Sequence, residues 1–327
     1  MPSRPAAAAA AAASASAPPL RVGVSACLLG REVRYDGQHK RDAFLVDQLG
    51  PFVEFVPVCP EVEVGMPIPR ETLHLVRVEK DVRLRTTATR EDWTARMNTF
   101  SRRRVKQLAG EGLSGYVFKK NSPSCGVWRV KTYGDGNPSA VERSGQGLFA
   151  AALTEAFPHL PVEEEGRLTD PRLRENFIER LFAYRRLQTL WEGPWTQGKL
   201  VAFHTAHKMA LLAHDEPTYR KLGRLVAQGK DLARGELRAQ YEAGFMGALT
   251  KLATPGRHAN VLTHMLGHFS DQLDPPARQE LLELIEDHRR GLVPLIVPLT
   301  LLRHHVKRLN VEYLAGQVYL DPHPKEL

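Results

Sequence analysis

The sequence predicts an α/β N-terminal domain built on a parallel, Rossmann-like sheet, followed by an all-α C-terminal domain. Three short runs of β-branched and aromatic residues, at 22–26, 53–58 and 113–118, have the pattern of strands. Helical patterns lie between these runs, at 41–49 and 92–109, and strands that alternate with helices build parallel sheets. After about residue 170 the strand pattern is absent, which predicts a helical second half.

Composition divides the chain into four parts. Residues 1–19 are almost entirely Ala, Ser and Pro, which predicts a disordered extension rather than a secretory signal. Residues 20–160 hold the alternating strands and helices, and residues 161–169, with three successive glutamates, are predicted to be a linker. Asp170 and Pro171 then supply an N-cap and a first helical residue, which starts an all-helical domain over 170–327.

Charge and cysteine content narrow the class of protein. The 327 residues carry a formal net charge of +8, which predicts an anionic partner without naming it. The three cysteines are too few and too widely spaced for a disulfide framework, so we expect a reducing, cytoplasmic environment. The most apolar late stretch, residues 292–302, is too short and too interrupted by proline to cross a bilayer, so no membrane partner is expected.

The remaining elements follow from local patterns. A hairpin is expected across residues 73–85, and residues 146–157 form the last amphipathic helix of the first domain. In the second domain apolar residues recur at helical spacing throughout. The expected helices lie near residues 171–190, 199–213, 217–227, 232–250, 258–272, 276–290 and 294–308.

Each cysteine falls where a predicted strand ends. Cys27, Cys59 and Cys125 follow the first, second and third runs, and the carboxyl ends of parallel strands open into one crevice. Three thiolates are one short of a closed zinc site or a fully ligated cluster, whereas a [4Fe-4S] cluster held by three cysteines keeps one iron free. The alternative is that these are three buried structural thiols, and the pattern alone leaves both possibilities open.

Polar residues beside the cysteines are candidates for chemistry and for substrate binding. Glu61 and Ser122 lie two and three residues from a cysteine, so they could serve as general acid or base. The structural alternatives are a capping or solvated carboxylate for Glu61 and a turn-forming hydroxyl for Ser122. The loops after the first and third strands supply the expected substrate contacts, Arg34, Asp36, Lys120 and Asn121.

Two further groups of residues, the spaced histidines and the basic clusters, each allow a functional and a structural interpretation. His204 and His207 are three residues apart, and His264 and His268 four, which places each pair on one helix face. Neither pair has the glutamate of a zincin motif, so satisfied core or surface histidines are the better interpretation. Basic clusters are usually solvated faces, but they could also bind phosphates. The candidate phosphate-binding residues are Arg102, Arg103, Arg104, Arg303, Lys307 and Arg308.

Four motifs surround the cysteines in order, Ser25-Ala26-Cys27-Leu28-Leu29-Gly30, Tyr35-Asp36-Gly37, Cys59-Pro60-Glu61 and Ser122-Pro123-Ser124-Cys125-Gly126. Together they resemble the thiouracil desulfidase family over about residues 20–160. One departure is Val64, which stands where many relatives have a glycine before Gly65. The second half resembles the helical domain of unknown function that is found fused to this family, and the fused arrangement resembles bacterial tRNA 4-thiouridine desulfidases. For such an enzyme the basic clusters are candidate tRNA-binding residues.

The resemblance implies a [4Fe-4S] cluster on Cys27, Cys59 and Cys125, with Glu61 and Ser122 as catalytic residues. It also implies removal of sulfur from 4-thiouridine in thiolated tRNA. Because a thiocarbonyl carbon and a carbonyl carbon have the same oxidation level, we expect a hydrolytic, non-redox conversion to uridine, with the sulfur leaving through the free iron. Three alternatives remain open. They are a desulfidase of free thiopyrimidine bases, a non-enzymatic iron–sulfur sensor that binds nucleic acid, and a structural zinc module that lacks an evident fourth ligand.

Overall fold

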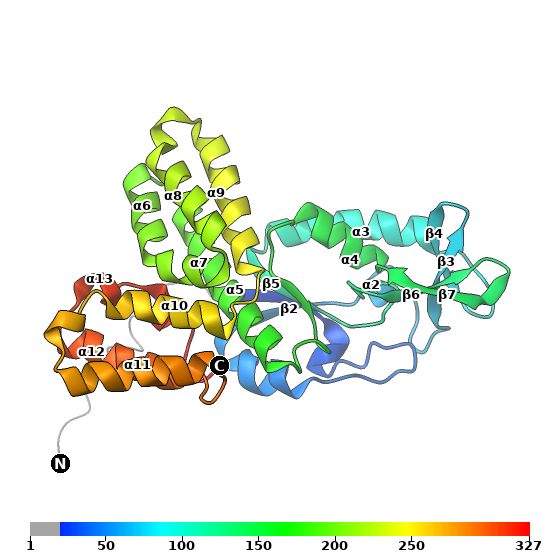
Figure 1. Cartoon of the computed structure of the whole chain (residues 1–327). Helices are drawn as coiled ribbons and strands as arrows, with labels where there is room; N and C mark the ends of the chain where they lie inside the picture. The colour runs from blue at the N-terminus through cyan, green and yellow to red at the C-terminus, as the bar shows by residue number, and fades with distance from the viewer. Residues whose placement is uncertain (1–19) are drawn as a thin grey trace, which may run out of the picture. The chain divides into compact units, whose positions relative to one another are not determined.

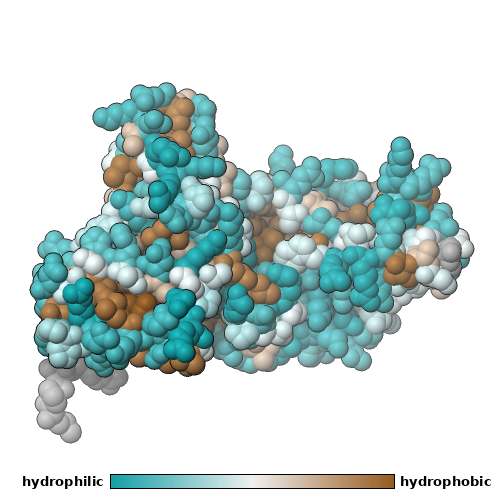
Figure 2. Space-filling view, viewed as in Figure 1, coloured by the Kyte–Doolittle hydropathy of each residue, from teal (hydrophilic) through white to brown (hydrophobic). Residues whose placement is uncertain are grey.

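The computed structural model describes residues 20–327, and the predicted extension over residues 1–19 lies outside them. The chain forms two compact units, divided between Gly166 and Arg167 (Figure 1). The first unit contains parallel strands with helices, and the second is helical, which confirms the predicted fold classes. Figure 2 shows that hydrophilic residues cover most of the visible face of the first unit.

The main sheet of the first unit is parallel. It consists of β1 (Arg21–Ser25), β2 (Glu54–Val58), β5 (Leu113–Phe118) and β8 (Val162–Glu164), in the order β2-β1-β5-β8. The central strand β5 is buried along its whole length, as expected for a strand covered on both faces. The three predicted strands are therefore present, and they are direct neighbours in the sheet.

The connections place helical segments on both faces of this sheet. The π-helical segment η3 (Phe44–Leu49) joins β1 to β2 on one side of β1, and later connections run the other way toward β5 and β8. Because such crossovers are right-handed, a reversed direction puts the helices on the opposite face. Accordingly α3 (Thr94–Ala109) and α4 (Leu148–Ala156) lie side by side on the face opposite η3 (Figure 1).

A second, mixed sheet projects from the first unit and was only partly predicted. The expected hairpin is present as the antiparallel pair β3 (Leu73–Val78) and β4 (Asp81–Thr86). Two further strands, β6 (Val130–Gly134) and β7 (Asn137–Gly145), extend it to the order β4-β3-β6-β7. Strand β6 pairs with β3 in parallel, so it depends on a contact distant in sequence that the local pattern does not reveal.

The structure differs from the predicted linker over residues 161–169. Strand β8 occupies residues 162–164 and pairs with β5, so this segment completes the main sheet. Glu163, Glu164 and Glu165 are all buried. Charged residues are rarely buried without partners, and Glu164 illustrates the reason here, since it accepts the backbone N–H groups of Val127 and Trp128 at 2.7 and 3.2 Å.

The second unit consists of helices throughout its described length. The predicted N-cap is confirmed, because the Asp170 side chain accepts the N–H groups of Arg172 and Leu173. None of the helices in residues 20–327 is long and apolar enough to span a membrane. The main helices are α5 (Pro171–Trp191), α6 (Gln197–Ala206), α7 (Lys208–His214), α8 (Glu216–Ala227), α9 (Arg234–Leu249), α10 (Pro255–Leu266), α11 (Pro275–Arg289), α12 (Ile296–Arg308) and α13 (Glu312–Ala315).

One predicted helix of the second unit is broken. The sequence predicts a single helix over 199–213, whereas the structure separates α6 from α7 at His207. The Nδ1–H of His207 donates to the carbonyl oxygen of Phe203 at 2.7 Å. The backbone N–H of His207 is shared between the carbonyl oxygens of Phe203 and His204, at 3.2 and 3.1 Å, a shared bond of the kind that is common where a helix ends.

Candidate functional site

The three cysteines lie at one edge of the main sheet. Since β1 lies between β2 and β5, the loops that follow these three strands open side by side at their carboxyl ends. Cys27, Cys59 and Cys125 all line one crevice there, with a cavity volume of about 360 Å³. Cys27 and Cys125 are buried and Cys59 is half-buried, and all three are free thiols.

Burial sets the protonation of these thiols. It raises the pKa of Cys27 to about 11, with a further contribution from Cys59, and it raises the pKa values of Cys59 and Cys125 as well. Binding of a metal group therefore has to displace protons from them. Within residues 20–327, no group of three or more Cys, His, Asp or Glu residues is placed to hold one metal ion.

Glu61 lies on the wall of the crevice and is held from two sides. It occupies the first turn of the short helix α2 (Pro60–Glu63), which starts directly after Cys59. The Nη2 and Nε atoms of Arg70 lie 2.6 and 2.9 Å from Oε2, and the Ser124 hydroxyl donates to Oε1 at 3.0 Å. The carboxylate is therefore fixed in direction, which a positioned acid or base requires.

Ser122 forms the turn that presents Cys125. Its Oγ accepts the backbone N–H groups of Ser124 and Cys125 at 3.2 and 3.1 Å, so the structural role foreseen for this hydroxyl is real. Ser122 also lines the crevice, and because its oxygen accepts these bonds, its own O–H proton remains to be donated. The turn packs tightly against Gly147, where an added Cβ would lie 2.5 Å from the Ser124 carbonyl carbon.

Lys119 and Lys120 are fixed by Glu165, the residue directly after β8. Glu165 accepts the backbone N–H of Lys120 at 2.7 Å and forms an ion pair with the Lys119 ammonium group. The Lys119 backbone N–H donates to Ser25 Oγ at 2.9 Å. Both lysines line the crevice, so Glu165, placed by the end of β8, fixes its cationic side.

The other predicted substrate contacts lie at or near the crevice. Arg34 and Asn121 line it, whereas Asp36 does not and instead pairs with Arg34 at 3.2 Å. The hydrogen bond to Arg34 lowers the pKa of Asp36, so this carboxylate stays ionised and orients the guanidinium. Tyr35 and Lys40 complete the same wall.

The predicted phosphate-binding residues have unequal surroundings. On α3, Arg102 and Arg103 are exposed, but Arg104 is half-buried and pairs with Glu63 at 3.1 Å, which ties it to the helix that carries Glu61. On α12, Arg303 is 13% exposed and pairs with Asp321 at 3.3 Å, so it supports the C-terminal segment. Lys307 and Arg308 are exposed.

The histidine pairs are not brought together as a metal site. His204 and His207 are buried in the second unit, and His204 Nδ1 lies 3.2 Å from the Tyr241 hydroxyl. His264 and His268 are exposed, with ring centroids 5.4 Å apart. These placements agree with the structural interpretation of both pairs.

Sequence reasoning missed Arg70, Ser124, Lys119 and Glu165 as parts of the site. Two signals were available for Arg70 and Ser124, since Arg70 follows a proline-rich loop directly after the Glu61 motif and Ser124 adjoins Cys125. Glu165 had no such signal, because its role depends on β8 pairing with β5. Lys119 acquires its role through Glu165.

Comparisons with known proteins agree with this division. A family described as 2-thiouracil desulfurase matches residues 22–165, and a family described as protein of unknown function (DUF1722) matches residues 208–324. An uncharacterized protein of Escherichia coli strain K12, YbgA, is 36% identical over 157 residues, which cover 47% of this chain and 92% of that protein. An uncharacterized protein of Bacillus subtilis strain 168, YbbK, is 32% identical over 150 residues, covering 43% and 95%.

One solved structure is also similar. It is a [4Fe-4S]-dependent thiouracil desulfidase, TudS, at 30% sequence identity and a TM-score of 0.40, covering 49% of this chain and 99% of that one. The α/β fold and its cysteine crevice, together with the family match, define the first unit as a sulfur-removing enzyme domain. The chain belongs to the 2-thiouracil desulfurase family and carries a DUF1722 domain in its second unit.

Proposed function

We propose that this protein removes sulfur from 4-thiouridine in tRNA, with water as the source of the replacing oxygen and a [4Fe-4S] cluster as its cofactor. The observation that carries the proposal is the convergence of three cysteines and a fixed glutamate in one crevice. A thiocarbonyl carbon and a carbonyl carbon have the same oxidation level. The reaction therefore balances as C=S plus H₂O giving C=O plus H₂S, with no external reductant.

The residues present fit the proposed cluster. A cluster binds each cysteine through a different iron, so its sulfur ligands need not converge on one point, in agreement with the lack of a single-ion site among residues 20–327. Cys27, Cys59 and Cys125 would hold it. When bound through three cysteines, such a cluster supplies one iron with an open position, a Lewis acid that prefers sulfur ligands.

The protein's own residues would manage the protons. Glu61 would accept a proton from the attacking water. Arg70 and Ser124 fix the direction of its carboxylate, and Glu61 lies only two residues after Cys59 in the chain. Ser122 would donate its O–H to the pyrimidine, because its oxygen already accepts two backbone N–H groups. Arg34, Lys120 and Asn121 would orient the base from the crevice walls, with Asp36 positioning Arg34.

The tRNA assignment is supported by charge and by the second unit. The net charge of +8 suits a polyanionic partner, and a free base needs no additional helical unit. A nucleotide within folded RNA has to leave its stack before C4 can enter a crevice. We expect phosphate contacts from Arg102 and Arg103 on α3 and from Lys307 and Arg308 on α12, whose side chains are exposed.

A free thiopyrimidine base is the second candidate substrate. Two observations favour it, the 2-thiouracil desulfurase description of the matching family and the small crevice of about 360 Å³. The two candidates share the same chemistry at carbon, so they differ only in what must be bound outside the crevice.

The test is anaerobic turnover by the full chain with thiolated tRNA and with free 2-thiouracil in water enriched in oxygen-18. The proposal expects about four irons per chain for this cluster type, sulfide release, and one heavy oxygen in each uridine formed. Turnover of the free base alone would favour the second candidate, and uridine without heavy oxygen would exclude the hydrolytic route. Replacement of Lys307 and Arg308 by Gln should reduce the slope of log affinity for tRNA against log salt, whereas the exposed control Lys230→Gln outside both clusters should not.

A further inference from the structure

A second cavity adjoins the cysteine crevice in the first unit. It has a volume of about 710 Å³ and runs along the second sheet, lined by strands β3, β4, β6 and β7 and their loops. Thr72, Leu73, Asn121 and Pro123 line both this groove and the crevice, so the two spaces share a wall. A ligand held in the crevice can therefore extend into the groove.

The groove is strongly cationic. Four cationic side chains line it, and its single carboxylate, Asp135, is already paired with Arg85 at 3.0 Å. Arg90, Lys131 and Arg143 are exposed and form no ion pair within residues 20–327. Three positive charges are thus available to an anionic ligand. The pKa of His74 is lowered by burial and then by Arg85 and Arg90, which agrees with a positive potential along this wall.

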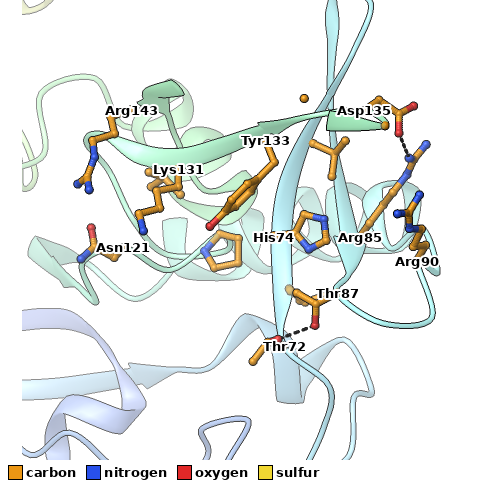
Figure 3. Close-up of a pocket in the computed structure, with 16 residues that line it drawn as sticks. Thr72, His74, Arg85, Thr87, Arg90, Asn121, Lys131, Tyr133, Asp135 and Arg143 are labelled. Carbon is orange, nitrogen blue, oxygen red and sulfur yellow. Dashed lines mark hydrogen bonds and ion pairs between the residues drawn. The ribbon is translucent and has the colours of Figure 1, made fainter. Parts of the chain in front are cut away.

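Aromatic rings lie between the charges. Tyr133 is half-buried on β6, and the ring of His74 on β3 meets it edge to face, with centroids 5.5 Å apart. Figure 3 shows the Tyr133 ring between Lys131 and Arg143 at one end of the groove and Arg85 and Arg90 at the other. His74 Nδ1 is buried and lacks a hydrogen-bond partner among the described residues. Cations that flank an aromatic platform are typical of sites for single-stranded nucleic acid.

We propose that this groove binds the RNA strand next to the thiolated nucleotide, with Lys131, Arg143 and Arg90 contacting phosphates and Tyr133 stacking on a neighbouring base. This assignment rests on the proposed function and adds a strand-binding subsite within the first unit itself. A free base occupying the crevice would leave these charges unused. A single terminal phosphate would use one end of the groove but not the aromatic ring between the ends.

The first test measures binding without turnover. The full chain is titrated calorimetrically with pentauridylate, an RNA with no thiolated base, at several salt concentrations. Lys131→Gln and Arg143→Gln should each weaken binding severalfold and reduce the slope of log affinity against log salt by about 0.7, the value for one phosphate contact on a single strand. Tyr133→Leu should weaken binding about tenfold and leave the slope unchanged, because stacking releases no counterions.

The matched control is Lys80→Gln, an exposed cation between β3 and β4 that does not line the groove. It should change neither affinity nor slope. Wild-type affinity and slope in all three groove variants would overturn the assignment. Equal competition by uridine 5′-monophosphate would also overturn it, because one phosphate would then account for the binding.

The second test separates this inference from the proposed function. The groove variants should lose catalytic efficiency severalfold on a trinucleotide with central 4-thiouridine and retain it on the free nucleoside. If the wild type turns over no thiolated substrate but the groove variants still alter pentauridylate binding, the proposed function fails and the groove assignment stands. Normal turnover with unaltered RNA binding in every variant would overturn the groove assignment alone.

Discussion

Arg70 binds Glu61 through two nitrogens, with Nη2 2.6 Å and Nε 2.9 Å from the same carboxylate oxygen. The same Nη2 donates to the carbonyl oxygen of Val33 at 2.9 Å, and the Arg70 side chain is only 3% exposed. This planar two-point contact sets the orientation of the carboxylate in a way that a lysine ammonium cannot reproduce. In the proposed reaction Arg70 is therefore a positioning residue that acts through Glu61.

Replacement of Arg70 by Lys should lower turnover at least about tenfold while iron content is retained. Removing one partner of a buried ion pair destabilises a protein by about 3–5 kcal/mol. Lysine keeps the positive charge beside the Glu61 carboxylate, so this variant avoids that loss. Steady-state kinetics and iron analysis of the same preparation check this. The control Arg77→Lys, whose wild-type partner is the exposed Glu142, should keep full activity. Wild-type kinetics in Arg70→Lys would leave Arg70 with a purely structural role.

Replacement of Glu61 by Gln should abolish most turnover without loss of iron. The amide keeps the size of the side chain but cannot accept a proton, and a positioned acid or base contributes roughly 10²–10⁴ in rate. The neighbouring Glu63 provides the control, since it accepts the Cys59 backbone N–H at 2.9 Å and lies outside the crevice. Glu63→Gln should therefore lower the rate far less. Similar losses in both variants would mean that helix α2, and not the Glu61 carboxylate, is what catalysis requires.

Gly147 should not tolerate a methyl group. Its added Cβ would lie 2.5–2.8 Å from backbone atoms of Ser124 and Cys125, so Gly147→Ala has to displace the loop that carries Cys125. Overpacking of this kind costs about 1–3 kcal/mol. Gly247 in α9 is the matched control, because its Cβ would meet no atom within 4 Å, and Ala there should stabilise the helix by up to about 1 kcal/mol. Thermal unfolding and iron content of both variants check the prediction, which fails if Gly147→Ala unfolds and binds iron like the wild type.

The sequence predicted the elements whose patterns are local. Strand β5 is a short run of mainly aromatic and aliphatic residues, and Asp170 followed by Pro171 marks a helix start, so both were found from neighbouring residues alone. The meeting of Cys27, Cys59 and Cys125 was also predictable, because it needs only the rule that parallel strands open at one edge.

What the sequence could not predict depends on distant partners. Strand β6 exists because it pairs with β3, and β8 because it pairs with β5. Three glutamates in a row look solvated, yet Glu164 and Glu165 are buried acceptors for loops more than thirty residues away. In each case the decisive interaction competes with the local pattern.

The second unit should lose stability as pH falls below about 6.5. Burial lowers the pKa of His207 to about 3 and those of His204 and His258 to about 4, whereas unfolded histidine titrates near 6.5. Between these values the unfolded chain binds more protons than the folded chain. Each such group then contributes a slope of about 1.4 kcal/mol per pH unit, with stability present above pH 6.5 and lost toward acid.

The His214–Glu179 pair acts outside this window. Burial opposes the charge on His214, but Glu179 at 3.0 Å raises the pKa of His214 overall. The contribution of His214 to folding stability is therefore complete below pH 6.5, and it is lost as pH rises through the pKa of His214 in the folded protein. His214 lowers the pKa of Glu179, although burial acts in the opposite direction. The contribution of Glu179 to folding stability is therefore lost only as pH falls below the ordinary glutamate range. Between about pH 4.5 and 6.5 the three neutral histidines should therefore dominate.

Replacement of His204 by Leu tests this assignment directly. The variant removes one of the three titrations, so the slope of unfolding free energy against pH should decrease by about 1.4 kcal/mol per pH unit between pH 5 and 6. Urea unfolding of the full chain, followed by far-ultraviolet circular dichroism at several pH values, gives that slope. Because a merely destabilising substitution shifts the whole curve without changing its slope, an unaltered slope in His204→Leu would show that His204 is not a group whose protonation opposes folding.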